Sequence, residues 1–292
     1  MRRATVGLVV AASVFVTVLP ASAQKAPLLV DPAWLRARLG DPAVRIVDMV
    51  TEPEDYQKGH IAGSVYLNIN DARIPVATGG FRLPDPDEAA RLFRAVGIAP
   101  ETHVVIYDDA GGLHASRLFF TLDVFGHERV SILDGGVHTW RRAKLPLTTD
   151  LPRVAPTNYR PPRRAERVAT AEWLRDRLQD PGVVIVDARS PGEFSGSDRR
   201  AKRGGHVPGA VNIEWKRILR LDWTFKPIEE LQAMYAARGV VPDKTVATYC
   251  QTHHRAAHTY FVLRLLGYPR VVGYDRSWVE WGNREDLPVE SK

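Results

Sequence analysis

The 292-residue chain has one cysteine, Cys250, and its neighbours are those of a reactive thiol. An apolar run over 245–249 is typical of a buried strand and ends directly before it, and an apolar helical pattern begins a few residues later. We therefore expect the thiol at the start of a tight loop that ends in a helix N-terminus. Backbone N–H groups of such a loop cradle an anion, and the helix dipole favours a thiolate there. The alternatives are a buried, inert thiol or an intermolecular bridge, since a lone cysteine cannot form an internal disulfide.

The residues after the cysteine complete a polar loop that is predicted to bind a small anionic substrate. They are Gln251, Thr252, His253, His254 and Arg255. The two histidines and the arginine are expected to add positive charge or hydrogen-bond donors, which a nucleophilic sulfur needs when it meets an anionic sulfur donor. No metal site is predicted, because adjacent histidines lack i, i+4 spacing and one cysteine cannot complete a thiolate cage. No cofactor is predicted either.

The chain contains an internal repeat. Residues 34–48 recur at 173–187 with eleven of fifteen positions identical, and the stretch 59–65 matches 205–211. Near the end of each half, Asp134 with Trp140 matches Asp275 with Trp281. An offset this constant indicates a tandem duplication of one domain, and each copy has an ordinary domain size.

The composition predicts where the two copies are joined. We place an N-terminal domain at 24–147, a linker at 148–167 and a C-terminal domain at 168–292. The linker is rich in proline and arginine. Because proline fixes φ and removes a backbone donor, this segment is expected to be an extended connector.

Each half alternates strand and helix patterns. Short amphipathic helices are predicted at 34–39 and 173–178. Strands are predicted at 44–49, 104–107 and 130–133 in the first half, and at 183–188, 245–249 and 271–273 in the second. This order predicts an α/β fold of two tandem domains, each a mostly parallel sheet flanked by helices on both faces. Ligands of such sheets bind beyond the carboxyl ends of the strands, which is where Cys250 falls.

The N-terminus has the pattern of a secretory signal. Arg2 and Arg3 precede an apolar run over 6–19, followed by Ala21-Ser22-Ala23. We predict a signal peptide at 1–23, cleaved after Ala23. The run is shorter than the roughly 20 residues of a membrane span, although a retained anchor is the alternative. A periplasmic or secreted protein without stable membrane association after cleavage is therefore expected.

The overall charge limits the class of partner. The chain has a net charge of +6, a pI of about 9.5 and 45% hydrophobic residues. Its aromatic residues do not interleave with a basic stripe, so nucleic acid is not an expected partner. A small anionic substrate agrees with the charge. The oligomeric state has no signal in the sequence.

Several landmarks occur in order along the second half: Val186-Asp187-Ala188-Arg189, Glu193-Phe194, the stretch 205–212, the loop from Cys250 to Arg255, and Ser277-Trp278 with Glu280-Trp281. With these, the chain resembles the tandem-domain rhodanese family of thiosulfate and 3-mercaptopyruvate sulfurtransferases over about residues 28–290. The resemblance implies that Cys250 is the catalytic residue, which takes the outer sulfur of a donor and holds it as a persulfide. It also implies that the loop amides from Gln251 to Arg255 stabilise that sulfur.

The resemblance assigns roles to three further residues. Arg189 is expected to bind the anionic substrate beside the thiol, with an interdomain salt bridge as the alternative. Asp187 is expected to shape the loop rather than react. His206 is expected to pack and hydrogen-bond structurally, because its copy His60 lies in the half that lacks a thiol.

The first half departs from the family pattern. Asp108 stands where the second half has Cys250, and Val50 stands where it has Arg189. An aspartate cannot carry transferable sulfur, and its charge repels an anionic donor. We therefore expect the first half to be catalytically silent and to serve as a wall of the site, which would lie between the domains.

The resemblance leaves several functions open. A cationic loop favours thiosulfate as donor, with a thiophilic acceptor such as cyanide, and 3-mercaptopyruvate is the alternative donor. A non-turnover sulfur carrier or binding module would have the same residues. Phosphatases that share this fold use a loop one residue longer than the four residues between Cys250 and Arg255, so phosphate-ester hydrolysis is disfavoured.

Overall fold

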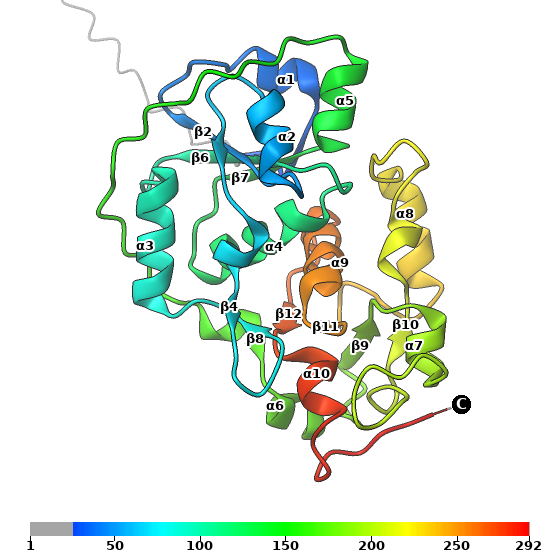
Figure 1. Ribbon diagram of the computed structural model, residues 1–292. Coiled ribbons are helices and arrows are strands. Elements are labelled where there is room, and N and C mark those ends of the chain that lie inside the picture. Colours follow the sequence, from blue (N-terminus) through cyan, green and yellow to red (C-terminus); the bar gives the residue numbers. More distant parts are fainter. Residues whose placement is uncertain (1–25, 292) are drawn as a thin grey trace, which may run out of the picture.

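The computed structural model describes residues 26–291, and these form two similar α/β halves that lie side by side (Figure 1). The sheet of the first half has the strand order β1-β7-β6-β2-β3, and that of the second half has the order β10-β9-β11-β12-β8. Every strand pair in these two sheets is parallel. The predicted α/β fold of two tandem domains is confirmed.

The elements of the first half are β1 (Leu29–Val30), α1 (Pro32–Arg36), β2 (Val44–Asp48), α2 (Pro53–Lys58), β3 (Val65–Tyr66), η1 (Ile69–Ala72), β4 (Ile74–Pro75), β5 (Phe81–Arg82), α3 (Pro86–Val96), β6 (His103–Tyr107), α4 (Leu113–Val124), β7 (Val130–Leu133) and α5 (Gly136–Arg142). Strands β4 and β5 form a separate antiparallel hairpin.

The elements of the second half are η2 (Ala165–Arg167), β8 (Val168–Ala169), α6 (Ala171–Arg175), β9 (Val183–Asp187), α7 (Pro191–Ser195), β10 (Val211–Asn212), η3 (Trp215–Ile218), α8 (Ile228–Ala236), β11 (Thr245–Tyr249), α9 (His254–Leu265), β12 (Val271–Tyr274) and α10 (Ser277–Trp281).

The middle strand of each sheet is the one that leads to the candidate site. In the second half β11 is paired with β9 on one side and β12 on the other, as β6 is paired with β2 and β7 in the first half. Both middle strands are buried almost throughout, because helices cover them on both faces. The loops at their carboxyl ends are therefore held on a rigid base.

The two halves share a hydrophobic core. Helix α4 of the first half packs along α9 of the second half, and the rings of Phe119 and Phe261 meet edge to face with centroids 4.9 Å apart. All residues of α4 from His114 to Val124 are buried, as expected for a helix covered on every side. A single cluster of buried residues contains side chains from both sheets and both helices.

The predicted strands agree with the observed ones to within one residue at each end. The helices predicted at 34–39 and 173–178 are observed two residues earlier, at 32–36 and 171–175. The displacement is explained by side-chain caps: Asp31 accepts a hydrogen bond from the Trp34 amide, and Thr170 accepts one from the Trp173 amide.

Two sequence predictions concern the ends of the domains. No helix or strand lies between α5 and η2 in the described chain, which is consistent with a connector, and the exact domain limits stay a prediction. The predicted signal peptide at 1–23 lies outside the described residues. Within residues 26–291, no helix is long and apolar enough to cross a bilayer.

Candidate active site

Cys250 follows β11 directly, and α9 begins four residues later, at His254. Its backbone is held by the start of α10: the carbonyl accepts a hydrogen bond from the Trp278 amide at 3.0 Å, and the amide donates to Ser277 Oγ at 3.3 Å. Ser277 itself has φ +51°, which its counterpart Gly136 reproduces at +54°. The thiol is thus placed on a fixed turn at the carboxyl edge of the sheet, as the sequence predicts.

The thiol is covered by apolar side chains. Cys250 is 0% exposed and packs with Ala188, Trp215 and Ala256. Leu113, the first residue of α4, and Leu219 pack against this cluster. Because Leu113 belongs to the first half, that half contributes a wall of the site. Nothing in the local sequence around Cys250 indicates Leu113, Trp215 or Leu219, which come from distant segments.

The equivalent loop of the first half shows what this loop geometry binds. The Asp108 carboxylate accepts hydrogen bonds from four backbone amides, those of Ala110, Gly112, His114 and Ala115, at 2.8–3.0 Å. The loop is therefore an anion cradle whose anion is a side chain of the same loop.

The loop of the second half has a similar but not identical backbone, because Gly112 is left-handed (φ +87°) and its counterpart His254 is already the first residue of α9. His253 has φ +56° where Gly111 has φ +67°, and a helix begins after each loop. The amides that correspond to the four donors of the first half belong to Thr252, His254, Ala256 and Ala257. With Cys250 in the place of Asp108, these amides are the donors expected around the charge on sulfur.

Arg255 keeps a positive charge beside the thiol. Its guanidinium donates to both carboxylate oxygens of Glu193, at 2.6 and 2.8 Å, and its side chain is 19% exposed. Burial alone would lower the pKa of Arg255, but the bonds to Glu193 and the interaction with Cys250 raise it above its usual value. Conversely, burial alone would raise the pKa of Glu193, and Arg255 lowers it to about 2. The role of Glu193 was not predicted, although its capping box with Ser190 is visible in the sequence.

Arg189, which is predicted to bind substrate, is buried and has its charge paired within the second half. The side chain is 1% exposed, and Nη2 donates to Asp187 Oδ2 at 2.6 Å and to the Gly205 carbonyl at 2.8 Å. The guanidinium also lies over the Trp278 ring, 4.4 Å from its centroid. Burial alone would lower the pKa of Arg189, but the charge and hydrogen bonds of Asp187 raise it. Among the described residues Arg189 is thus paired with Asp187 of its own half rather than across the domains, and its predicted contact with substrate stays a prediction.

The histidines of the loop differ from the prediction of a cationic loop. Burial lowers the pKa of His253 to about 3 and that of His254 well below its usual value. His254 stacks on His114 of the first half with ring centroids 5.1 Å apart. The His253 imidazole points into the contact between the halves rather than toward a ligand. Both rings are neutral near pH 7, so the positive charge of this loop comes from Arg255 and from the backbone amides.

The remaining loop side chains lie at the edge of the site. Gln251 Nε2 donates to the Arg200 carbonyl at 3.1 Å, while Gln251 Oε1 is buried and accepts no hydrogen bond from the described residues. Thr252 is partly buried at the tip of the loop. Neither side chain is tied to Cys250, so their predicted contact with substrate stays a prediction.

The structural roles expected for Asp187 and His206 agree with the contacts. Asp187 Oδ1 accepts a hydrogen bond from the Arg189 amide at 2.9 Å, which shapes the turn after β9. The His206 ring stacks on Phe194 at 3.6 Å, and its Nδ1 lies 2.8 Å from the Phe194 carbonyl. His60 makes the same pair of contacts with Tyr56 in the first half.

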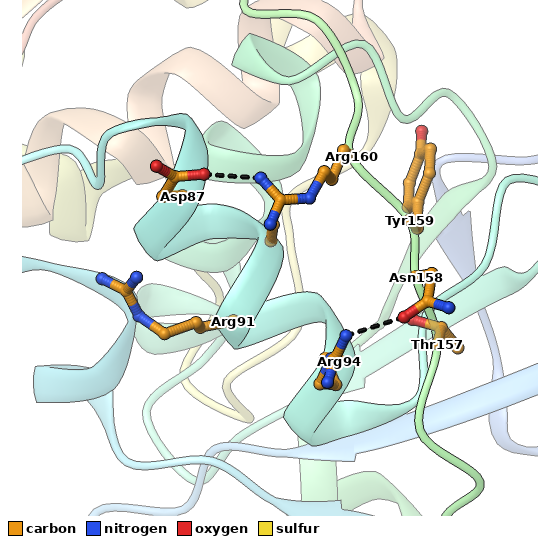
Figure 2. A pocket seen from close by; sticks show the side chains of 8 residues that line it. Asp87, Arg91, Arg94, Thr157, Asn158, Tyr159 and Arg160 are labelled. Atoms are coloured by element: carbon orange, nitrogen blue, oxygen red, sulfur yellow. Dashed lines mark hydrogen bonds and ion pairs between the residues drawn. The ribbon is translucent and has the colours of Figure 1, made fainter.

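A second hollow lies away from the thiol. A cavity of about 590 Å³ lies between α3 and the connector. Figure 2 shows two of its contacts, where Arg160 is paired with Asp87 and Arg94 with Asn158. These arginines already have partners, and the lining contains no nucleophile. In the part of the chain that the structure describes, no group of three or more histidine, cysteine or acidic residues is placed to hold a metal ion.

The fold and this loop define a class: a two-domain α/β protein that presents one thiol in an anion-binding loop at the carboxyl edge of a parallel sheet. The model of the rhodanese-like domain matches residues 31–143 and 170–284. The chain belongs to the rhodanese-like family, and it is a sulfurtransferase of the two-domain type.

Curated relatives and solved structures are similar along nearly the whole chain. A thiosulfate sulfurtransferase of Azotobacter vinelandii is 38% identical over 90% of this chain and 97% of its own length. The sulfur carrier protein TtuD of Thermus thermophilus is 35% identical over 90% of this chain and 96% of its own. The anaerobic ergothioneine biosynthesis enzyme of Chlorobium limicola superposes with a TM-score of 0.82 at 25% identity, covering 90% of this chain and 70% of that one.

Proposed function

We propose that this chain is a thiosulfate sulfurtransferase that carries sulfane sulfur on Cys250. The observation that supports this most directly is the Asp108 carboxylate inside its ring of four amides. In the second half the aligned loop carries Cys250 at the position of Asp108, so we expect its amides to serve as donors to an anionic sulfur there. Relatives in Azotobacter vinelandii and Pseudomonas aeruginosa carry the name thiosulfate sulfurtransferase at 38% identity.

The reaction has two stages. The Cys250 thiolate attacks the outer sulfur of thiosulfate, the S–S bond of the donor breaks, and sulfite leaves with the bonding electron pair. The outer sulfur stays on Cys250 as a persulfide, whose charge the amides of Thr252, His254, Ala256 and Ala257 stabilise. A thiophilic acceptor such as cyanide then attacks the outer sulfur and restores the thiolate.

The proposal also specifies the compound that donates the sulfur. Thiosulfate is a dianion, which agrees with the charge of Arg255 and the amide ring. Because the loop histidines are neutral, the charge available is smaller than the sequence predicts, and 3-mercaptopyruvate is the second candidate donor. A sulfur carrier is the second candidate function, because a relative at 35% identity carries that name.

The test is the mass and turnover of the protein with its only thiol intact or replaced. Thiosulfate should add about 32 Da to the wild-type protein, and cyanide should remove it. Cys250→Ser should lose turnover almost entirely, since a serine hydroxyl stays protonated and cannot hold sulfane sulfur. Cys250→Ser that still turns over, or wild-type protein that gains no mass from either candidate donor, would exclude the proposed reaction. Sulfur loading without steady turnover would favour the carrier.

We propose further that the protein is exported and that its domains are separated within 148–167. The support for export is the sequence pattern at 1–23, and that for the boundary is the proline-rich composition together with the absence of a helix or strand between α5 and η2 in the described chain. After expression in a bacterium with its leader, the exported protein should begin near Gln24. An intact Met1 on exported protein would count against cleavage.

A further inference from the structure

The feature that leads to a further inference is the backbone of His253. It has φ +56°, in the left-handed region that a residue with a Cβ rarely adopts. The equivalent residue of the first half is Gly111, which adopts φ +67° without this cost. The backbone conformation alone would favour glycine at this position. Contacts of the histidine side chain must therefore compensate the backbone strain.

The imidazole of His253 is inserted between the two halves. It is 0% exposed, and its ring centroid lies 4.4 Å from that of Phe120 on α4 of the first half. On the other side it lies against β12 at Gly273, where a Cβ would come within 2.6 Å of His253 Nε2. The ring thus fills a space shaped by both halves, and the glycine in β12 makes that space available.

Two long hydrogen bonds orient the ring. Nδ1 lies 3.4 Å from Arg117 Nη1, and Nε2 lies 3.4 Å from Thr248 Oγ1. Since a guanidinium can only donate, Nδ1 accepts, and Nε2 carries the proton that is donated to Thr248. The neutral ring is thereby fixed between α4 of the first half and β11, the strand that ends at Cys250.

Arg117 is itself anchored across the interface. Its Nη1 lies 2.6 Å from Asp275 Oδ1, and the other oxygen of Asp275 accepts the Leu83 amide at 2.5 Å. Arg117 is 0% exposed, so this ion pair is held in a low-dielectric environment. The chain of contacts runs from the first half through Arg117 to His253, three residues after the thiol.

We propose that His253 is a positioning residue through which the silent half holds the sulfur-transfer loop in its reactive shape. It touches neither donor nor sulfur. It fixes the one left-handed residue of the loop, and this sets the direction of the following amides toward Cys250. The inference rests on the proposed persulfide chemistry of Cys250, and it gives the first half a role in that chemistry without a reactive group.

The test compares His253→Gly with His253→Asn in the full-length protein. Glycine relieves the backbone strain but removes the imidazole, so the loop keeps its allowed shape without being held in it. Misplaced loop amides should lower kcat by about 10- to 100-fold. KM should stay within about threefold, because no substrate contact is lost. Asparagine tolerates the left-handed region and offers both an acceptor and a donor, so it should recover part of kcat.

Tyr260→Phe is the matched control. Tyr260 lies on the same helix α9, and its hydroxyl donates to Asp123 of the first half at 2.6 Å rather than to a residue of the loop. This variant should lower the unfolding midpoint and leave kcat unchanged. A loss of kcat in His253→Gly with a similar midpoint then separates loop positioning from general stability.

Three results would overturn the inference. These are a folded His253→Gly variant with kcat within about twofold of wild type, a rise in KM at constant kcat, or a loss of kcat in the Tyr260→Phe control equal to that in His253→Gly. If His253→Gly fails to fold, the Thr248→Val variant tests the inference instead, because it removes only the hydroxyl that pairs with His253 Nε2. A fall in kcat at constant KM supports the inference, and unchanged kinetics overturn it. Persistent turnover of Cys250→Ser is a separate outcome, which refutes the proposed function and not the loop contact.

Discussion

At the scale of single residues, two arginines of the second half have different roles. Arg255 is partly exposed and lies beside the thiol, whereas Arg189 is buried in a bond to Asp187. In the first half Val50 replaces Arg189, and the counterpart of Asp187, Asp48, has its pKa raised to about 6 by burial. Arg189 thus supplies a buried carboxylate with an opposite charge that the first half lacks. The sequence does not reveal this pairing, because it places the backbone of Arg189 but does not specify which carboxylate the long side chain contacts.

The first residue-scale prediction concerns Arg189→Ala. Removing the guanidinium leaves Asp187 as an uncompensated buried charge, so the free energy of unfolding should fall by about 3–5 kcal/mol. Asp187→Asn in the same chain should restore part of this loss. Urea unfolding measures both. Substrate binding by Arg189 predicts instead a folded variant whose KM for thiosulfate rises by 10- to 100-fold, corresponding to about 1.5–3 kcal/mol.

At the scale of elements, a strand, a loop and a helix N-terminus form a unit that occurs twice. The first copy binds its own carboxylate through four amides, and the second carries a thiol at the aligned position. The sequence predicts this unit well, since β-branched residues mark the strands, the offset between the halves is constant and Asp108 aligns with Cys250. It does not predict the neutral histidines, because their burial comes from α4, more than a hundred residues earlier in the chain.

The element-scale prediction concerns Asp108→Ala. Several buried amides would lose their acceptor, which should cost about 1–3 kcal/mol of unfolding free energy for each group that water does not reach. Turnover should stay within a few-fold, because the change lies outside the reacting loop. Asp109→Ala is the matched control: Asp109 binds only the amide and hydroxyl of Thr51, so its loss should cost less. A loss of turnover like that of Cys250→Ser, in folded protein, would give the first loop a part in the chemistry.

At the scale of the whole molecule, the two halves are one folding unit despite their repeat. Helices α4 and α9 pack together within a single core, and Phe119 and Phe261 lie at their contact. The sequence indicates the duplication and the strands of each copy. It does not indicate which helix faces of the two copies meet, since polar and apolar residues are mixed around both helices and leave no distinct apolar face.

The prediction at this scale is a single unfolding transition. Circular dichroism follows both halves, whereas labelling of Cys250 follows only the second, and the two midpoints in urea should coincide. Phe119→Ala should shift both together, by about 3–5 kcal/mol for a fully packed phenylalanine. A thiol that reacts while half of the secondary structure remains would show that the halves unfold separately.

The complete burial of Cys250 has a consequence for chemical selectivity. A thiol with no exposed surface admits only reagents slender enough to pass between Trp215, Leu219 and Leu113, or those that arrive while these side chains are displaced. Small linear nucleophiles such as cyanide meet this requirement, and bulky thiols do not. We therefore expect the wall that Leu113 contributes to select by size, so that bulky thiols take sulfur from the proposed persulfide more slowly than cyanide does.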